Sequence, residues 1–109
     1  MYSILFDIYE SSRSSAFYGA EIKEIHLHHD IILIDEGAFA YSNIKIDLRE
    51  LTNLKTIGDG AFYKSIEITI YLPQTLETIG SYAFANNPLS IISIPNIVIS
   101  IGKSCFKML

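Results

Sequence analysis

The sequence is organised by a phenylalanine that returns at a nearly constant interval. Phe17, Phe39, Phe62, Phe84 and Phe106 follow one another at spacings of 22, 23, 22 and 22 residues. A fixed period of this length is typical of stacked supersecondary units, each too small to bury its own apolar face. The chain is therefore predicted to be a repeat solenoid.

Each phenylalanine stands in a recurring pattern. Alanine precedes four of them and Cys105 the fifth, so Cys105 is expected to be a small buried core residue, and Ile-Gly stands upstream at 57–58, 79–80 and 101–102. Downstream comes an alternating apolar stretch that ends in proline, as in Ile70-Tyr71-Leu72-Pro73. This alternation predicts a short strand, which proline ends because it cannot donate to a sheet ladder. Gly-x-x-Ala-Phe is expected to form a tight turn, with its glycine at positive φ.

The pattern resembles the BspA-type leucine-rich repeat over about residues 13–109. The resemblance implies parallel strands on a concave face and short helical or 3-10 turns on the convex face. It also implies a role in adhesion or recognition, with no activity of the repeat itself. About four and a half units are expected, at 13–34, 35–57, 58–79, 80–101 and a partial 102–109. Arg13 and Asp35 depart from the pattern, because both stand where glycine belongs.

Both ends of the predicted solenoid need a cap, since a terminal coil otherwise exposes a slice of core. Residues 1–12 are predicted to supply the N-terminal capping strand, at about 2–9, with 11–15 as the connecting loop. The whole chain is expected to be one domain. At the other end, the half-coil 102–109 either serves as the cap itself or pairs with a second copy in a homodimer.

Unit two is one residue longer than the others, and the place of the extra residue decides which side chains face outward. We expect Ile46-Asp47-Leu48 to align with Ile25-His26-Leu27 and Ile70-Tyr71-Leu72, with the extra length in 49–53. This register keeps Ile46 and Leu48 inside. A simple count from Phe39 would instead bury Asp47 and Arg49, and unpaired buried charges are costly.

The outward strand positions in this register form one surface, which we call the panel. Its predicted members, the candidate protein-binding residues, are Glu24, His26, His28, Lys45, Asp47, Arg49, Thr69, Tyr71, Ile91 and Ser93. Aromatic and Arg side chains with a polar rim are typical of a surface that binds a protein partner.

Two histidines are the strongest hint of chemistry. His26 and His28 share one face of a strand, with Glu24 before them and Asp47 expected on the next strand. Imidazole and carboxylate could hold zinc, with His29 as a further ligand. Two ligands on one strand match a closed zinc site poorly, so we expect a solvated polar face and no metal.

Other function classes find no support in the sequence. There is no phosphate-binding glycine loop, nucleophile elbow or zinc-protease motif, and no cofactor is expected. Eight basic residues against twelve acidic ones give a net charge of −4, which disfavours nucleic-acid binding. No apolar run is long enough for membrane insertion. The first ten residues do not resemble a signal peptide, so a cytoplasmic protein is expected if Met1 is the native start, and otherwise a secreted or cell-surface one.

The sequence thus favours a non-enzymatic protein-interaction module that uses the strand face of a solenoid. Two alternatives remain open. One is a small intracellular inhibitor, encoded by a phage or mobile element, that masks a partner enzyme. The other is a metal-dependent protein that uses the His26 and His28 strand.

Overall fold

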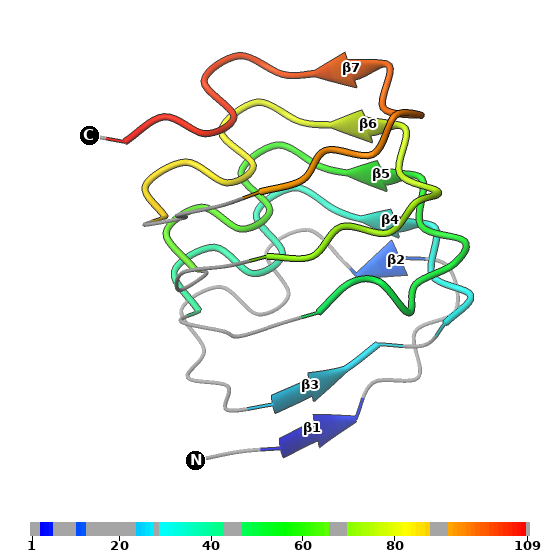
Figure 1. The fold of residues 1–109 in the computed structure, drawn as a ribbon. Coiled ribbons are helices and arrows are strands. Elements are labelled where there is room, and N and C mark those ends of the chain that lie inside the picture. The colour runs from blue at the N-terminus through cyan, green and yellow to red at the C-terminus, as the bar shows by residue number, and fades with distance from the viewer. Residues whose placement is uncertain are drawn as a thin grey trace.

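The chain winds into coils that stack along one axis, as a computed structural model shows (Figure 1). The structure describes residues 3–5, 11–12, 24–27, 29–42, 47–65, 70–87 and 92–108. These residues form short strands and turns, and none of them lies in a helix. Accordingly, the described part of the chain offers no helix suited to crossing a membrane.

One parallel sheet runs the length of the stack. It contains β2 (Ser11–Ser12), β4 (Leu33–Ile34), β5 (Thr56–Ile57), β6 (Thr78–Ile79) and β7 (Ser100–Ile101), in that order. Every neighbouring pair is parallel, and the strands lie one above another in Figure 1. Because parallel strands need a crossover connection, each repeat makes one full coil. The predicted parallel-strand solenoid is confirmed.

The main sheet does not lie where the alternating stretches predicted it. It forms at the two residues just before the glycine of the Ile-Gly step. Among the described residues, the predicted strand position carries β3 (Glu24–His26), paired with β1 (Ser3–Leu5), and an isolated bridge between Asp47 and Tyr71. Pro73 and Pro95 stop any ladder from extending past the end of this stretch, because neither has an N–H to donate to a neighbouring coil. The Thr-Ile segments keep all their N–H groups.

The Gly-x-x-Ala-Phe segments form turns that do not continue into the expected helical or 3-10 turn. We number the coils as the units, so that coil two is residues 35–57. In coil two, every second N–H closes a local turn, as the Ala38 N–H does on the Asp35 carbonyl at 3.2 Å. The N–H groups between them leave the coil, and Phe39 N–H donates to the Ala61 carbonyl at 2.8 Å. The same alternation recurs in coil three. Half of the donors that a helix would need are thus committed to the neighbouring coil.

The role predicted for the motif glycines was wrong. None of Gly58, Gly80 and Gly102 adopts a positive φ; that conformation occurs two residues later, at Gly37, Gly60, Tyr82 and Ser104. A Cβ on Gly80 would instead lie 2.5 Å from the Asp59 backbone nitrogen of the coil before it. These glycines are required because neighbouring coils touch backbone to backbone there.

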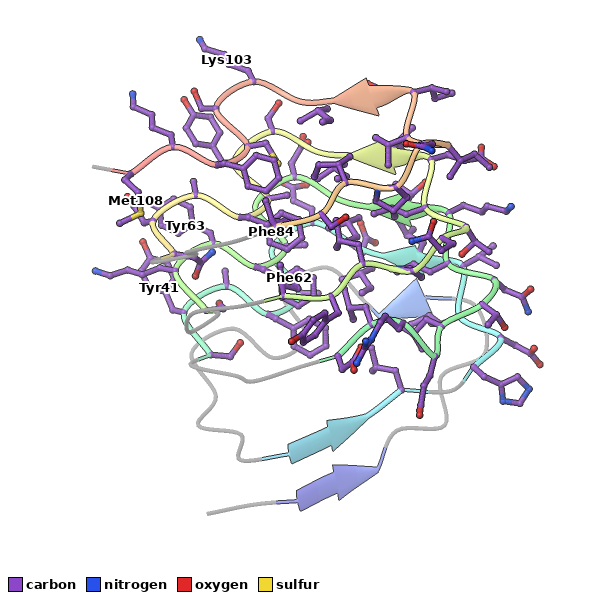
Figure 2. All side chains as sticks on the ribbon, in the orientation of Figure 1. Tyr41, Phe62, Tyr63, Phe84, Lys103 and Met108 are labelled. Carbon is purple, nitrogen blue, oxygen red and sulfur yellow. The ribbon has the colours of Figure 1, made fainter. Side chains whose placement is uncertain are left out.

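The four repeated phenylalanines that the structure describes form a stack through the interior. Ring centroids are 5.3 Å apart between Phe39 and Phe62, 5.5 Å between Phe62 and Phe84, and 5.6 Å between Phe84 and Phe106. Figure 2 shows Phe62 and Phe84 one above the other in the core. The alanines before them, and Cys105 in the same position, are buried as predicted. Small residues at this position let the coils come close enough for the rings to stack.

A buried polar ladder accompanies the rings. Ser42, Ser65 and Asn87 occupy equivalent positions in three coils, and all three are buried. The Ser65 N–H donates to Asn87 Oδ1 at 2.7 Å, and Asn87 Nδ2 donates to the Phe62 carbonyl at 2.7 Å. The hydroxyls of both serines donate to the Phe39 carbonyl. These side chains form hydrogen bonds with backbone N–H and carbonyl groups at the end of each turn. Because these polar groups have partners, this part of the coil can be buried.

The N-terminal strands fit the repeat differently from the prediction. Residues 11–12 were expected in a loop, yet they form β2 and begin the main sheet, because Ser12 aligns with Ile34 exactly one period later in the chain. Before it, β1 pairs in parallel with β3. The boundary between cap and solenoid at residue 12 stays a prediction.

Candidate protein-interaction surface

The structure describes four side chains of the predicted panel: Asp47, Arg49, Tyr71 and Ser93, all of them exposed. Side chains of the other panel members, which are Glu24, His26, His28, Lys45, Thr69 and Ile91, lie outside the described residues. The candidate site is therefore built from the described part of the panel, on coils two, three and four.

The predicted register of unit two is confirmed where the structure describes it. Asp47 bridges to Tyr71 in parallel, and the Leu48 N–H donates to the Tyr71 carbonyl at 3.1 Å. Leu48 and Leu72 are buried, whereas Asp47 and Tyr71 face outward. The hydrophobic pattern thus selects the register that avoids buried charge.

Unit two differs from unit three in two places: it is one residue shorter between Phe39 and Leu48 and two residues longer between Leu48 and Leu54. Leu54 N–H closes a turn on the Leu51 carbonyl, as Leu76 N–H does on the Pro73 carbonyl. Leu51 therefore takes the place of Pro73. Because Pro73 follows Leu72 directly, the two residues between Leu48 and Leu51 have no counterpart in coil three. They are Arg49 and Glu50, which form an exposed bulge. Arg49 was predicted at an outward strand position of the panel, but it lies in this bulge directly after that strand segment.

Arg49 is held in place from two sides. Its Nη2 donates to Asp47 Oδ2 at 2.6 Å and its Nε to Asp47 Oδ1 at 3.0 Å, a bidentate pair. The guanidinium carbon lies 4.2 Å from the centroid of the Tyr71 ring. The hydrogen bonds from Arg49 lower the pKa of the Asp47 carboxyl, and Asp47 in turn raises the pKa of Arg49. We name these three residues the Asp-Arg-Tyr cluster.

The cluster is open to solvent. The side chains of Arg49 and Asp47 are 60% and 44% exposed, and Tyr71 is 47% exposed. An ion pair this exposed contributes little to stability, because water screens it. What the geometry provides is a planar guanidinium and an aromatic ring in a fixed arrangement.

Comparison with known proteins assigns the repeat. A family model for the BspA-type leucine-rich repeat region matches six copies across residues 10–109. This chain belongs to the BspA-type leucine-rich repeat family. Among solved structures, the pneumococcal vaccine antigen PcpA is similar, with a TM-score of 0.75 and 23% sequence identity. The match covers 96% of this chain and 27% of that one, and it shows the shared fold. No curated protein matches the sequence.

The turns of the leucine-rich repeat carry a second group of aromatic side chains, which the panel did not include. Tyr41 and Tyr63 lie with ring centroids 5.4 Å apart, and Asn86 Nδ2 donates to the Tyr63 hydroxyl at 2.6 Å. Figure 2 shows both tyrosines at the turn edge of the solenoid. Tyr41 and Tyr82 are exposed and adopt positive φ. The sequence offered little signal for Asn86, because its contact crosses from one coil to the next.

The histidine hypothesis stays a prediction. The side chains of His26 and His28 lie outside the described residues, and within the described part no group of three metal-binding side chains is found. His29 Nε2 lies 3.4 Å from Asp30 Oδ1 in an exposed turn of the leucine-rich repeat. The absence of a metal site stays a prediction.

Cys105 is 3% exposed and occupies the alanine position of the repeat. Burial raises the pKa of its thiol to about 11. A thiol that stays protonated at neutral pH is a poor nucleophile, so the residue has the properties of a core side chain.

Proposed function

We propose that this chain is a non-enzymatic protein-binding module whose partner docks on the panel at the Asp-Arg-Tyr cluster. The cluster is the single observation that carries the proposal. Arginine and tyrosine are over-represented among the residues that dominate binding energy at protein interfaces. Here Asp47 and the Tyr71 ring already order the arginine, so less side-chain entropy is lost when a partner binds.

The position of the cluster supports the same proposal. Arg49 and Glu50 have no counterpart between Leu72 and Pro73 of coil three, and they contribute no buried side chain to the core. A feature that the fold does not need, and that projects beside an outward strand position, is suited to recognition. Leucine-rich repeats present extended surfaces of this kind to other proteins.

Site-specific photo-cross-linking tests the proposal. We would place a benzophenone amino acid at Ser93, on the panel beside the cluster, and at Glu36, an exposed turn residue outside the panel, as a control. Each protein would then be irradiated in a lysate of the source cells. The expected result is one cross-linked product from position 93 and none from position 36. Excess unlabelled wild-type chain should suppress this product.

The matched variants decide whether the cluster itself binds. Arg49→Ala and Tyr71→Ala chains should compete poorly, while melting within a few degrees of the wild type, because exposed substitutions change stability little. Competition equal to that of the wild type would place recognition elsewhere, with the Tyr41 and Tyr63 edge as the next surface to test. The identity of the cross-linked protein decides the alternative of an inhibitor, since that alternative requires an enzyme whose activity the chain reduces.

A further inference from the structure

Two tyrosines on neighbouring coils lie in direct ring contact at the turn edge of the solenoid. The ring centroids of Tyr41 and Tyr63 are 5.4 Å apart, within the range of about 4.5–7 Å that aromatic pairs prefer, and their planes are tilted by 56°. Tyr41 is 45% exposed and Tyr63 is partly exposed. Figure 2 shows both rings at this edge. We call these two residues the tyrosine pair.

The tyrosine pair is anchored at both ends. The Tyr41 N–H donates to the Tyr63 carbonyl at 2.9 Å, which joins the two backbones. At the other end, Asn86 Nδ2 from coil four donates to the Tyr63 hydroxyl at 2.6 Å. Because the backbones are joined and the Tyr63 hydroxyl is held, the two rings stay close to each other and open to solvent.

The repeat itself does not require this pair of phenols. Within coils two to four, the other residues at the two positions are Ala40 and Ala85, and Lys64 and Asn86. The fold therefore accepts residues without an aromatic ring at both positions. The contact between two phenols is a property of the boundary between coils two and three.

We propose that the tyrosine pair is a site of oxidative coupling, at which a peroxidase that uses hydrogen peroxide joins the two rings as dityrosine. Each phenol gives up one electron and one proton and becomes a phenoxyl radical. A carbon–carbon bond then forms between the ring carbons next to each C–O group, and the hydrogens on those two carbons move to the oxygens. Hydrogen peroxide accepts both electrons and both protons and is reduced to two water molecules.

The product would be a covalent link between coils two and three, in a chain that has lost two hydrogen atoms. Two radicals held in contact meet at a far higher effective concentration than radicals on separate chains in dilute solution. Among the described residues, no other two tyrosine rings are in contact. Cys105 is 3% exposed and so is shielded from the oxidant. The site is separate from the Asp-Arg-Tyr cluster and does not depend on the function proposed above.

Peroxidase treatment of the full chain tests the proposal. Dilute folded protein would be treated with a haem peroxidase and hydrogen peroxide, then denatured and digested with trypsin, which cleaves after lysine and arginine. Tyr41 is the only tyrosine in peptide 24–45, and Tyr63 is the only tyrosine in peptide 56–64. We expect one cross-linked species that joins these two peptides, with a mass two hydrogen atoms below their sum. Neither peptide contains methionine or cysteine, so oxidation of sulfur does not obscure this mass.

Matched phenylalanine variants assign the link to the pair. Tyr41→Phe and Tyr63→Phe should each abolish the cross-linked species, because phenylalanine has no phenol to oxidise, while both chains keep an aromatic ring at the contact. Tyr82→Phe removes an exposed tyrosine outside the pair and should leave the yield unchanged. The coupled chain should stay monomeric and melt at a higher temperature than the untreated chain, because the link restricts the unfolded state.

Three results would overturn the proposal. The first is coupling that joins separate chains or other peptides instead of 24–45 and 56–64. The second is an equal loss of the cross-linked species in Tyr82→Phe. The third is a chain that forms no dityrosine under conditions in which free tyrosine added to the same reaction does.

Discussion

Single glycines and one cysteine set how closely the coils can approach. Gly60 and Gly80 look alike in the sequence, but Gly60 has φ +61° with nothing near its Cβ position, whereas a Cβ on Gly80 would lie 2.5 Å from backbone. One glycine is required by its own torsion angle and the other by its neighbour. Substitution at the two positions should therefore differ in cost.

Gly80→Ala is expected to destabilise the fold by about 3 kcal/mol, because the added methyl forces two backbone segments apart. Gly60→Ala should cost about 1 kcal/mol, the strain of a left-handed conformation in open space. Urea unfolding of both variants measures the free energies of unfolding. Equal costs would show that the close approach of coils at Gly80 is wrong.

Cys105 links stability to alkaline pH. Its folded pKa is raised to about 11 from the ordinary value of 9.0. Above about pH 9 the unfolded chain loses the thiol proton while the folded chain keeps it, so this residue's contribution to stability falls as pH rises from 9 to 11. Below pH 9 the contribution is constant.

Cys105→Ala should remove that dependence, and alanine is the residue that the other coils have at this position. We expect the wild type to lose more of its unfolding free energy than the variant between pH 8.5 and 10.5, as measured by urea titration at each pH. Other titrating groups are common to both chains and cancel in the comparison. Parallel pH profiles would show that the thiol is accessible to solvent.

Among the structural elements, the phenylalanine stack joins the coils most directly. Phe62 has a stacked ring on each side, with interplanar angles of 10° and 2°, whereas Phe106 has a described neighbour on one side only. Stacked aromatic pairs add stability beyond the burial of their area. An inner ring should therefore contribute more than the terminal one.

Phe62→Ala is expected to cost about 3–5 kcal/mol, since it leaves a large cavity between two coils. The free energy of unfolding of a small domain is about 5–15 kcal/mol in total, so a loss of this size would leave the chain close to unfolded. Phe106→Ala should cost clearly less, because that ring is already partly exposed. Thermal melts followed by circular dichroism compare the two. A Phe62→Ala chain that melts within a few degrees of the wild type would contradict the stack.

Sequence reasoning identified the repeat, the buried rings and the outward direction of Asp47 and Tyr71, because each of these follows from periodic burial. It misplaced the main sheet, since a two-residue strand such as Thr56–Ile57 shows no alternation of its own. It also gave Gly80 the wrong role. The sequence alone does not show whether a glycine is required for a positive φ or for the close approach of a neighbouring backbone. The Arg49 contacts with Asp47 and Tyr71 depend on side-chain geometry across two coils. The repeat period of the sequence does not specify that geometry.

At the scale of the whole molecule, the described coils combine a regular core with an irregular segment in coil two. Arg49 and Glu50 have no counterpart in coil three and add nothing to the core, and the Asp-Arg-Tyr cluster forms at this bulge. We therefore propose that stability and recognition are separate: the regular positions hold the fold, and the bulge is the part that binds a partner.

Deletion of Arg49 and Glu50 tests this separation most directly, with deletion of Thr52 and Asn53 as the control. Joining Leu48 to Leu51 reproduces the junction of Leu72 and Pro73, so the first variant should keep its melting temperature within a few degrees. It should no longer compete for the partner cross-linked at position 93. The control removes the two residues before Leu54 that every described coil retains at the equivalent turn, and it should unfold. A chain that loses its fold together with binding, or keeps both, after deletion of Arg49 and Glu50 would contradict the account.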